Sequence, residues 1–554
     1  MKKIVLNIIT IFSLLLMVNC QEDNNSFGAL DAPSNFAITV DVMGKTDQTP
    51  FGDGSGKVKF ITTADNAVSF KYVYGDGIVD TAPGGVVEHA FTSVGVNTYT
   101  VTIIASGKGG VTSNTTVDVK VFSNFSDAKS TQLLTGGSAT GKKWYLAANE
   151  AGHLGVGQND GDATKNYYPN YYQAGPFEKS TTCFYDGDYT FALVGDKIEY
   201  TQDNKGNTFF HNSYKSVAGG TNGGDDACLP YSTAGKKTVA LSPSTSVVSK
   251  NPEAAKQTVG TVINFSEGGF MGYYAGATQY EILSITENRM VVRFVQANNA
   301  GLAWYQTFTT TRPVNVPQDT TEYTTLDWAD EFKVNGAPDP TKWKYDLGNG
   351  STTPAGAGWG NGEKQDYTNL AKNVSVVDGD FLKITAIKEG SGYTSARIKT
   401  QGLKEFTYGT IEMRAKMPVG DGTWAAFWSL GTAPVTWPGN GEIDFMEWIG
   451  NRPFQTQGAL HYPGNSGGSA KVGVSSLQDP SSFHTYKTIW SPKTIRFFID
   501  GTLFYTFSNS DTSLPFHKDF YMILNLAMGG SLGGEIDPGF TSSSMLVDYI
   551  KVYK

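Results

Sequence analysis

Residues 441–448 constrain this chain more than any other stretch, because they combine strand-forming apolar residues with three carboxylates, Glu442, Asp444 and Glu447. Side chains of a β-strand alternate between two faces, so Glu442 and Asp444 lie on the same face. Glu447 follows Glu442 by five residues and would face the other side of a regular strand. One extra residue, a β-bulge at Phe445 or Met446, brings all three acids to one face. We therefore predict a bulged strand that presents three carboxylates together.

The two glutamates of this strand have the spacing of a pair that cleaves glycosidic bonds. With the bulge they are effectively four residues apart, so their Cα atoms lie roughly 13 Å apart. Their side chains can lean toward each other and approach the ~5 Å carboxyl separation of a retaining glycosidase, in which one acid is the nucleophile and the other the proton donor. The alternative is a strand whose polar face happens to be acidic. Clustered like charges cost stability unless the protein uses them, which favours the catalytic interpretation.

The pattern Glu442-x-Asp444-x-x-Glu447 after a glycine resembles the signature of family 16 of the glycoside hydrolases, in its laminarinase-like form. The resemblance extends over residues 323–554, far beyond one short motif. Further segments that resemble landmarks of the family are 328–332 (Trp-Ala-Asp-Glu-Phe), 358–363 (Gly-Trp-Gly-Asn-Gly-Glu), 408–416 (Tyr-Gly-Thr-Ile-Glu-Met-Arg-Ala-Lys), 424–428 (Trp-Ala-Ala-Phe-Trp), 459–461 (Ala-Leu-His), 524–530 (Leu-Asn-Leu-Ala-Met-Gly-Gly) and 547–553 (Val-Asp-Tyr-Ile-Lys-Val-Tyr).

This resemblance implies an all-β fold whose C-terminal part, residues 323–554, is a β-jelly-roll sandwich with a cleft on its concave face. It implies retaining endo-hydrolysis of laminarin-type β-1,3-glucan, with Glu442 as nucleophile, Glu447 as acid/base, Asp444 between them, and no cofactor for catalysis. One alternative is a surface glycan-binding protein with a hydrolase-like capture domain. Another keeps the fold and changes the substrate to mixed-linkage β-1,3-1,4-glucan or a galactan. The intact set of three acids favours an enzyme, because a pure binding protein has no need of Glu447.

Further residues of this part are expected to contact the substrate. Trp424 and Trp428 are four residues apart and share one face of a strand, a spacing that suits stacking on sugar rings, although tryptophan also fills β-sandwich cores. Four polar residues fall where the family places substrate contacts: Asn361, Arg414, His461 and Asn525.

The resemblance also implies a structural calcium ion with oxygen ligands from Glu331, the carbonyl of Gly379 and Asp548.

The composition agrees with β-rich domains that bind a neutral glycan. Charged residues make up 17% of the chain and aromatic residues 13%, a balance that disfavours disorder. The formal net charge of -9 provides no electrostatic footprint for DNA or RNA, so nucleic acid is excluded as a partner. A heavily sulfated polysaccharide is disfavoured for the same reason.

The N-terminal segment predicts export and lipid anchoring. Residues 1–19 have two lysines followed by an apolar run that is too short for a membrane span, as in a signal peptide. The run ends at Cys20 in a sequence that resembles a bacterial lipobox, and the acidic residues after it resemble the export signal of Bacteroidetes-type lipoproteins. We expect lipidation of Cys20, a tether over residues 20–30, exposure at the outer membrane and association with a glycan-uptake complex. An ordinary secretory signal and a secreted protein are the alternative.

The region between the anchor and the hydrolase-like part divides into two further domains. Residues 31–122 resemble a PKD domain, a small Ig-like β-sandwich, and residues 125–312 form a β-rich middle domain with a faint resemblance to lipocalin-like barrels. Its role is open, and carbohydrate binding is one possibility. Four of its tyrosines either stack on sugars or pack a loop: Tyr167, Tyr168, Tyr171 and Tyr172. Residues 313–322, which contain Pro, Asp and Thr, are expected to be a linker.

Apart from Cys20, the cysteines of the chain are Cys183 and Cys228, both in the middle domain. Two cysteines in an exported chain favour one disulfide, and two free buried thiols are the alternative.

Overall fold

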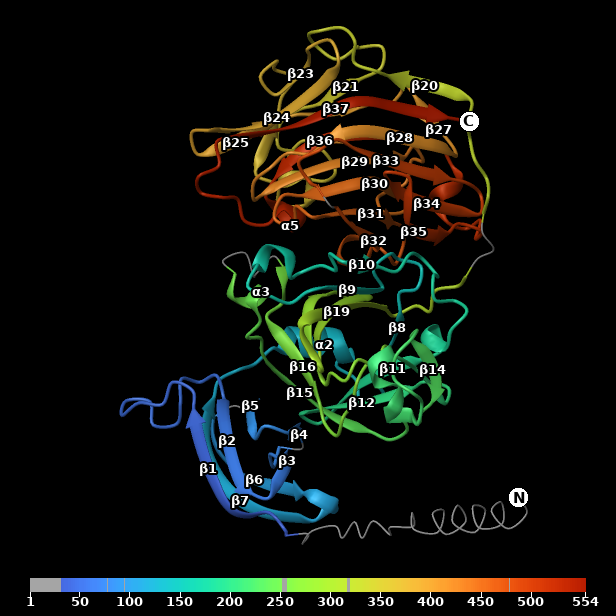
Figure 1. Ribbon diagram of the computed structural model, residues 1–554. Coiled ribbons are helices and arrows are strands. Elements are labelled where there is room, and N and C mark those ends of the chain that lie inside the picture. Colours follow the sequence, from blue (N-terminus) through green and yellow to red (C-terminus); the bar gives the residue numbers. More distant parts are fainter. Residues whose placement is uncertain (1–30, 77, 94, 252–256, 316–318, 478) are drawn as a thin grey trace, which may run out of the picture. The chain divides into compact units, whose positions relative to one another are not determined.

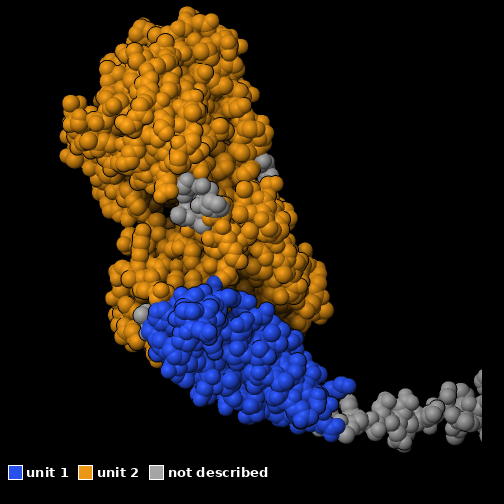
Figure 2. Space-filling view, turned by 90° about the vertical axis from the view of Figure 1, so that its left-hand side faces the viewer, with its two compact units in different colours: residues 1–91, 95–123 blue, residues 92–94, 124–554 orange. Residues whose placement is uncertain are grey.

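A computed structural model describes residues 31–76, 78–93, 95–251, 257–315, 319–477 and 479–554, and its regular structure is almost entirely β-strand (Figure 1). The predicted signal peptide, Cys20 and the tether lie outside the described residues. Among the residues that are described, no helix is long and apolar enough to cross a membrane. The chain separates into two compact units, one of residues 1–91 and 95–123 and the other of residues 92–94 and 124–554 (Figure 2).

The first unit is a small sandwich of two antiparallel sheets, in the region predicted to be Ig-like. The alternation of apolar and polar residues produces it: in β6, Val101, Ile103 and Ala105 are fully buried between outward-facing neighbours. The three-stranded sheet has the order β1 (Ser34–Val42), β2 (Lys57–Asp65) and β5 (Val86–Ala90). The four-stranded sheet has the order β4 (Val79–Ala82), β3 (Ala67–Val73), β6 (Gly95–Gly107) and β7 (Thr112–Ser123).

The middle domain is a closed, up-and-down β-barrel, the topology of lipocalin-like barrels. The barrel closes because β19 pairs with β18 on one side and with β8 on the other. Its strands follow one another around the ring in chain order: β8 (Lys142–Leu146), β11 (Asp188–Val194), β12 (Lys197–Asp203), β15 (Lys237–Pro243), β16 (Thr261–Phe265), β17 (Gln279–Ile285), β18 (Arg289–Gln296) and β19 (Asn299–Thr309). β9 (Leu154–Gln158) and β10 (Tyr172–Gln173) extend the sheet beyond β19, and β13 (Asn207–Phe210) pairs with β14 (Ala227–Pro230).

Side chains fill the barrel. Aromatic rings of Phe191, Tyr200 and Phe265 pack against one another inside it, and each is at most 2% exposed. A disulfide joins Cys183 and Cys228, with an S–S distance of 2.08 Å, and both cysteines pack against the same core. An eight-stranded barrel is narrow enough to be filled in this way, so its interior acts as a core.

The C-terminal domain is a sandwich of two sheets around one core (Figure 1). The ten-stranded sheet has the order β22 (Gln365–Tyr367), β25 (Gly392–Ser395), β24 (Phe381–Glu389), β37 (Ser542–Tyr553), β28 (Gly409–Lys416), β33 (His484–Trp490), β34 (Thr494–Ile499) and β35 (Thr502–Ser508), with β20 (Leu326–Asp330) on β37 and β23 (Val374–Val377) on β24. The eight-stranded sheet, called the cleft sheet below, has the order β21 (Lys344–Asp346), β26 (Arg397–Lys399), β36 (Phe520–Met528), β29 (Thr423–Gly431), β30 (Glu442–Ile449), β31 (Gln455–His461) and β32 (Lys471–Ser476), with β27 (Glu405–Phe406) on β36.

In the part of the chain that the structure describes, helices are few and short. The α-helices are α2 (Ala128–Thr135), α3 (Val247–Lys250) and α5 (Gly530–Gly533), and the 3-10 turns are η1 (Lys108–Gly110), η2 (Ala163–Lys165), η3 (Cys183–Tyr185), η4 (Asn212–Ala218), η5 (Ala357–Gly360), η6 (Gly467–Ser469) and η7 (Pro515–His517).

The barrel and the C-terminal sandwich belong to one compact unit and share backbone contacts. The N–H of Ala151 donates to the carbonyl of Phe504 at 2.7 Å, and Glu150 forms a β-bridge with Tyr505 of the edge strand β35. The predicted linker is also held in place at Asp319, whose carboxylate is 6% exposed and accepts a hydrogen bond from Thr494 at 2.7 Å. The contacts of Glu150 and Ala151 cover part of the edge strand β35, which would otherwise offer unpaired backbone groups.

The four tyrosines considered for sugar stacking divide into two pairs. Tyr167 and Tyr168 are 4% and 3% exposed, and Tyr168 stacks on Phe454 of the sandwich at 5.4 Å. These two therefore pack the junction between the domains, as the packing alternative predicted. Tyr171 and Tyr172 remain 62% and 36% exposed.

Candidate active site

The strand β30 carries the three acids and contains the predicted bulge. Trp428 of β29 pairs with Asp444, while the preceding Phe427 pairs with Met446. Phe445 is therefore the extra residue, and both Phe445 and Met446 point into the sandwich core. The parity of the strand changes at this point, so Glu442, Asp444 and Glu447 face the same side of the cleft sheet. The sequence prediction of the bulge is confirmed.

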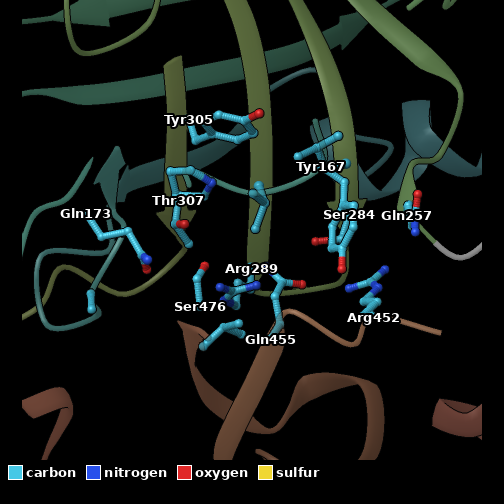
Figure 3. A pocket seen from close by; sticks show the side chains of 16 residues that line it. Tyr167, Gln173, Gln257, Ser284, Arg289, Tyr305, Thr307, Arg452, Gln455 and Ser476 are labelled. Carbon is cyan, nitrogen blue, oxygen red and sulfur yellow. The ribbon is translucent and has the colours of Figure 1, made fainter. Parts of the chain in front are cut away.

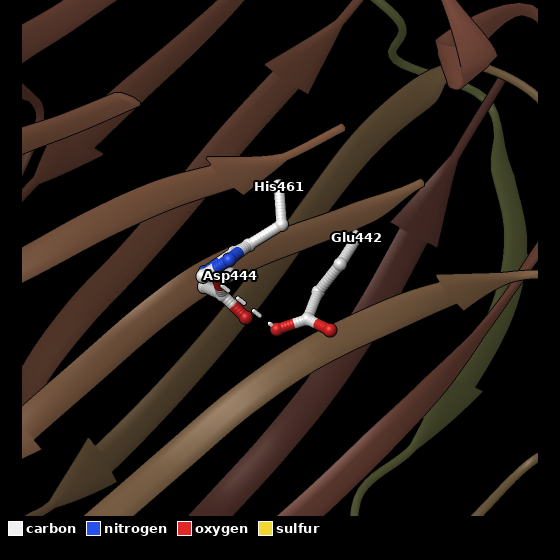
Figure 4. Close-up of side chains that lie close together, drawn as sticks. All are labelled: Glu442, Asp444 and His461. Carbon is white, nitrogen blue, oxygen red and sulfur yellow. Dashed lines mark ion pairs between the residues drawn. The ribbon is translucent and has the colours of Figure 1, made fainter. Parts of the chain in front are cut away.

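Glu442 lies at the start of β30 and remains partly open to solvent. Its side chain is 16% exposed, and its Oε2 accepts a hydrogen bond from Trp437 Nε1 at 2.8 Å. His461 Nε2 lies 3.7 Å from its Oε1 (Figure 4). Burial, and next the charge of Asp444, raise the pKa of Glu442 from 4.5 to about 8, against the opposing effects of His461 and the Trp437 hydrogen bond.

Asp444 is the most buried of the three acids, with 3% of its surface exposed. His461 Nε2 approaches its Oδ2 to 3.2 Å (Figure 4). Burial, and next the charge of Glu447, raise the pKa of Asp444 well above its usual value. Both causes favour the protonated form of Asp444, because adjacent charges in a desolvated site repel one another.

Glu447 is fixed by a donor on each carboxyl oxygen. Trp424 Nε1 donates to Oε1 at 3.2 Å and Gln457 Nε2 donates to Oε2 at 2.8 Å. The residue is 6% exposed, and burial raises its pKa in spite of these hydrogen bonds. A carboxyl with a raised pKa and a fixed orientation is suited to donate a proton to a bound group.

The two tryptophans considered for sugar stacking face the acids. Trp424 contacts Glu447 as described, and Trp428 lies opposite Asp444 on the neighbouring strand. Neither belongs to the sandwich core, which receives Ala425 and Phe427 from the same strand. The alternative that these tryptophans fill the core is therefore wrong, and their rings belong to the cleft face.

A hydrogen-bond network supports this face from the side of β36. Trp428 Nε1 donates to Asn525 Oδ1 at 2.8 Å, and Asn525 Nδ2 donates to the hydroxyl of Tyr367 at 3.0 Å. Tyr367 in turn donates to the buried carboxylate of Glu363 at 3.1 Å, which also accepts from Asn361 at 3.1 Å. The structure thus joins the predicted Asn361 and Asn525 to one network at the cleft, through two residues that the sequence analysis did not single out.

Arg397 is a further cleft residue that sequence reasoning missed. Its guanidinium lies over the rings of Trp359 and Trp428, at 4.4 and 4.8 Å from their centres, and pairs with Asp346. It lies beside Asn525 in the strand register. Nothing in its local sequence distinguishes it, because both aromatic neighbours come from distant segments.

The prediction that Arg414 contacts the substrate is corrected by the structure. Arg414 lies on β28 in the other sheet, and its guanidinium pairs with Asp548 and lies over Phe483. The neighbours Met413 and Ala415 point into the core, so strand alternation turns Arg414 to the outer surface of the sandwich. It cannot reach a sugar bound at the three acids.

The residues predicted to bind calcium are engaged in ion pairs. Glu331 pairs with Lys551 at 2.9 Å, Asp548 pairs with Arg414 at 2.5 Å, and the N–H of Gly379 donates to Asn335 at 2.7 Å. A basic side chain thus lies on each of the two carboxylates, whereas a calcium ion would take oxygen ligands there. Calcium binding stays a prediction. Among the described residues, the ligand atoms of Glu442, Asp444 and His461 lie within 4.8 Å of one another, but these are the groups of the acid cluster itself.

A sheet face with two glutamates on one strand, one of them partly exposed and the other oriented by two donors, defines a glycoside hydrolase. The aromatic rings of Trp424 and Trp428 beside the acids agree with a carbohydrate ligand. Two carboxyl groups and water suffice for this chemistry, so it needs no cofactor.

Comparison with known proteins specifies the family. Residues 361–551 match the family described as "Glycosyl hydrolases family 16". A β-glucanase of Rhodothermus marinus is 39% identical over 253 residues, which are 41% of this chain and 85% of that protein. A glucan endo-1,3-β-glucosidase of Cryptopygus antarcticus is 36% identical over 256 residues, 41% of this chain and 90% of that protein. The crystal structure of a laminarinase from Flavobacterium sp. UMI-01 is 41% identical, covering 42% of this chain and 100% of that one, with a TM-score of 0.39. The chain belongs to family 16 of the glycosyl hydrolases.

Proposed function

We propose that the chain is an endo-β-1,3-glucanase that acts with retention of the anomeric configuration. The observation that carries this proposal is the bulge at Phe445, which places Glu442 and Glu447 on one face with different environments. The relatives named above support the substrate class, since one of them is a glucan endo-1,3-β-glucosidase. The net charge of -9 favours a neutral glucan over an anionic chain.

In the first step the ionised Glu442 attacks the anomeric carbon of the sugar to be cleaved. The bond from this carbon to the glycosidic oxygen breaks, and Glu447 gives its proton to that oxygen as the leaving chain departs. In the second step Glu447, now ionised, takes a proton from water, whose oxygen attacks the same carbon and releases Glu442. Two displacements at one carbon return its original configuration.

The protonation states assigned to the three acids follow from their surroundings. Burial raises the pKa of both Asp444 and Glu447 and so favours their protonated forms, and Glu447 supplies the proton for the leaving group. Glu442 is the acid closest to solvent, and Trp437 and His461 both favour its ionised form. Both contacts stabilise the charged form of the residue that must act as nucleophile.

The deciding experiment is incubation of the purified chain with a panel of laminarin, mixed-linkage β-1,3-1,4-glucan and a galactan, with nuclear magnetic resonance of the first-formed product. We expect fragments of laminarin with the retained anomer, and loss of hydrolysis in Glu442→Ser with binding preserved. An inverted anomer would contradict the two-step mechanism. Hydrolysis of another polysaccharide and not of laminarin would contradict the substrate.

We also propose that the protein acts at the cell surface as a lipoprotein of the outer membrane, where a glycan-uptake complex receives its products. The support is the sequence pattern that ends at Cys20. Release of the chain from the membrane fraction in Cys20→Ala is the expected result.

A further inference from the structure

A polar hollow lies between the barrel and the C-terminal sandwich, and side chains of both domains line it (Figure 3). It contains about 550 Å³ of space that no atom fills, counted out to solvent at its mouth. The sandwich contributes Gln455, Val474 and Ser476, and the barrel contributes Gln173, Ser284 and Thr307.

The sandwich wall of this hollow is the same face that carries the three acids. Gln457 donates to Glu447 and pairs with Val474 of β32 in the strand register. The residues adjacent to Gln457 and Val474 are Gly458 and Gly473. A Cβ on Gly458 would meet Phe497 of the opposite sheet, and one on Gly473 would meet Tyr505, so both glycines face the core.

The residues of the wall therefore turn toward the cleft. Gln455 lies two residues before Gln457 on the same face, and Ser476 pairs with Gln455. Glu447 and Val474 are two strands apart, roughly 10 Å at the usual strand spacing. A chain bound across the acids and running toward β32 reaches the hollow.

The barrel residues that line the hollow lie on the outer surface of the barrel. Phe308 points into the barrel core, so the adjacent Thr307 faces outward by strand alternation. Gln173 comes from β10, the edge strand of the sheet that extends the barrel.

The polar groups of the hollow are available to a ligand. Within the described part of the chain, the side chains of Gln173, Gln455 and Ser476 make no hydrogen bond to the protein, although they line the hollow. Amide and hydroxyl groups can each donate and accept, as the hydroxyls of a neutral sugar require. Arg289 at the same place is paired with Glu150 at 2.8 Å, which balances its charge.

We infer that this hollow is a distal sugar-binding subsite, through which the middle barrel extends the cleft and selects long, neutral β-glucan chains over short ones. The inference rests on the proposed function, since the chain that reaches the hollow is the substrate of the three acids. It assigns a role to the barrel, which lies outside the residues 361–551 that match the family. Binding there depends on hydrogen bonds without an aromatic platform, because Tyr167 and Tyr305 at the hollow are 4% and 1% exposed.

The test compares kcat/KM for a long soluble β-1,3-glucan and for a short β-1,3-linked oligosaccharide in the full chain. In the double variant Gln173→Ala/Gln455→Ala, we expect the ratio of the two values to fall about five-fold or more, as the loss of two hydrogen bonds predicts, mainly through KM for the long chain. Ser476→Trp, which fills the hollow, is expected to lower the same ratio. The matched control is Gln132→Ala, an exposed glutamine on α2 that does not line the hollow.

The outcomes separate this inference from the proposed function. If the parent chain does not cleave β-1,3-glucan, the proposed function fails and the inference fails with it. If the parent cleaves the long glucan and both sets of variants, folded with an unchanged melting temperature, keep the parental ratio, only the distal subsite is overturned. A ratio that falls equally in Gln132→Ala would also overturn it.

Discussion

Glu442→Gln should make the protein more stable near neutral pH while it removes the nucleophile. The carboxyl of Glu442 is 16% exposed and has its pKa raised from 4.5 to about 8 by burial and by Asp444. Between these two values the folded protein holds a proton that the unfolded chain has released. The unfolded state therefore gains stability as the pH rises, and the native protein loses it. Glutamine resembles the protonated glutamate in shape and has no charge to desolvate.

The size of the effect follows from the pKa difference. At 1.36 kcal/mol per unit, the 2.5 units between 4.5 and pH 7 correspond to at most ~3 kcal/mol of unfolding free energy, and we expect about 2–3 kcal/mol. At pH 4 the unfolded chain is itself mostly protonated, so the gain should be near zero. For a domain of this size ~1 kcal/mol shifts the melting temperature by about 2–4 °C, so the variant should melt about 4–12 °C higher at pH 7.

The assay is differential scanning calorimetry of the parent and the variant at pH 4 and pH 7. The control is Glu405→Gln, an exposed glutamate of the same domain, for which no pH-dependent gain is expected. An equal gain at both pH values would show that ionisation of Glu442 is not its cause. A loss of stability at pH 7 would refute the reasoning, because it would mean that the protein stabilises the charged carboxylate.

Further predictions concern the acid/base, the middle acid, the anchor and the disulfide. Glu447→Ala should be nearly inactive on polysaccharide, yet azide should restore turnover of a substrate with a good leaving group, giving a retained glycosyl azide by nuclear magnetic resonance; no rescue would contradict the role of Glu447. Asp444→Asn should lose less kcat than either glutamate variant, and an equal loss would give Asp444 a direct role in the chemistry. Cys20→Ala should abolish lipid labelling and membrane retention in cell fractionation, and unchanged retention would exclude the lipoprotein. Replacing Cys183 and Cys228 by serine should lower the stability of the barrel by ~3–4 kcal/mol in a denaturant titration, and recovery of both thiols free in the parent would contradict the disulfide.

Local chemistry determined much of this protein from the sequence alone. The apolar and polar alternation of strands such as β6 and β28 indicated an all-β chain, because the period of two depends only on strand geometry. The bulge in β30 followed from the need to bring Glu442 and Glu447 to one face. Both features depend on neighbours along the chain, and a single sequence contains them.

Only the tertiary structure decided which sheet each strand joins. Arg414 lies in a segment that matches the family pattern, yet β28 belongs to the sheet opposite the acids. Arg397, in contrast, enters the cleft because β26 pairs with β36 and brings it between Trp359 and Trp428. Strand order across a sheet is set by contacts between residues far apart in sequence, and local alternation carries no information about it.

The closure of the barrel and its packing against the sandwich also depend on tertiary contacts. Pairing of β8 with β19 joins the two ends of the middle domain, and Tyr168, considered for sugar binding, stacks on Phe454 of the next domain. An aromatic residue that binds a sugar and one that packs an interface have the same local sequence signal, because both bury apolar surface. What covers such a residue depends on the fold, and for Tyr168 it is another domain of the same chain.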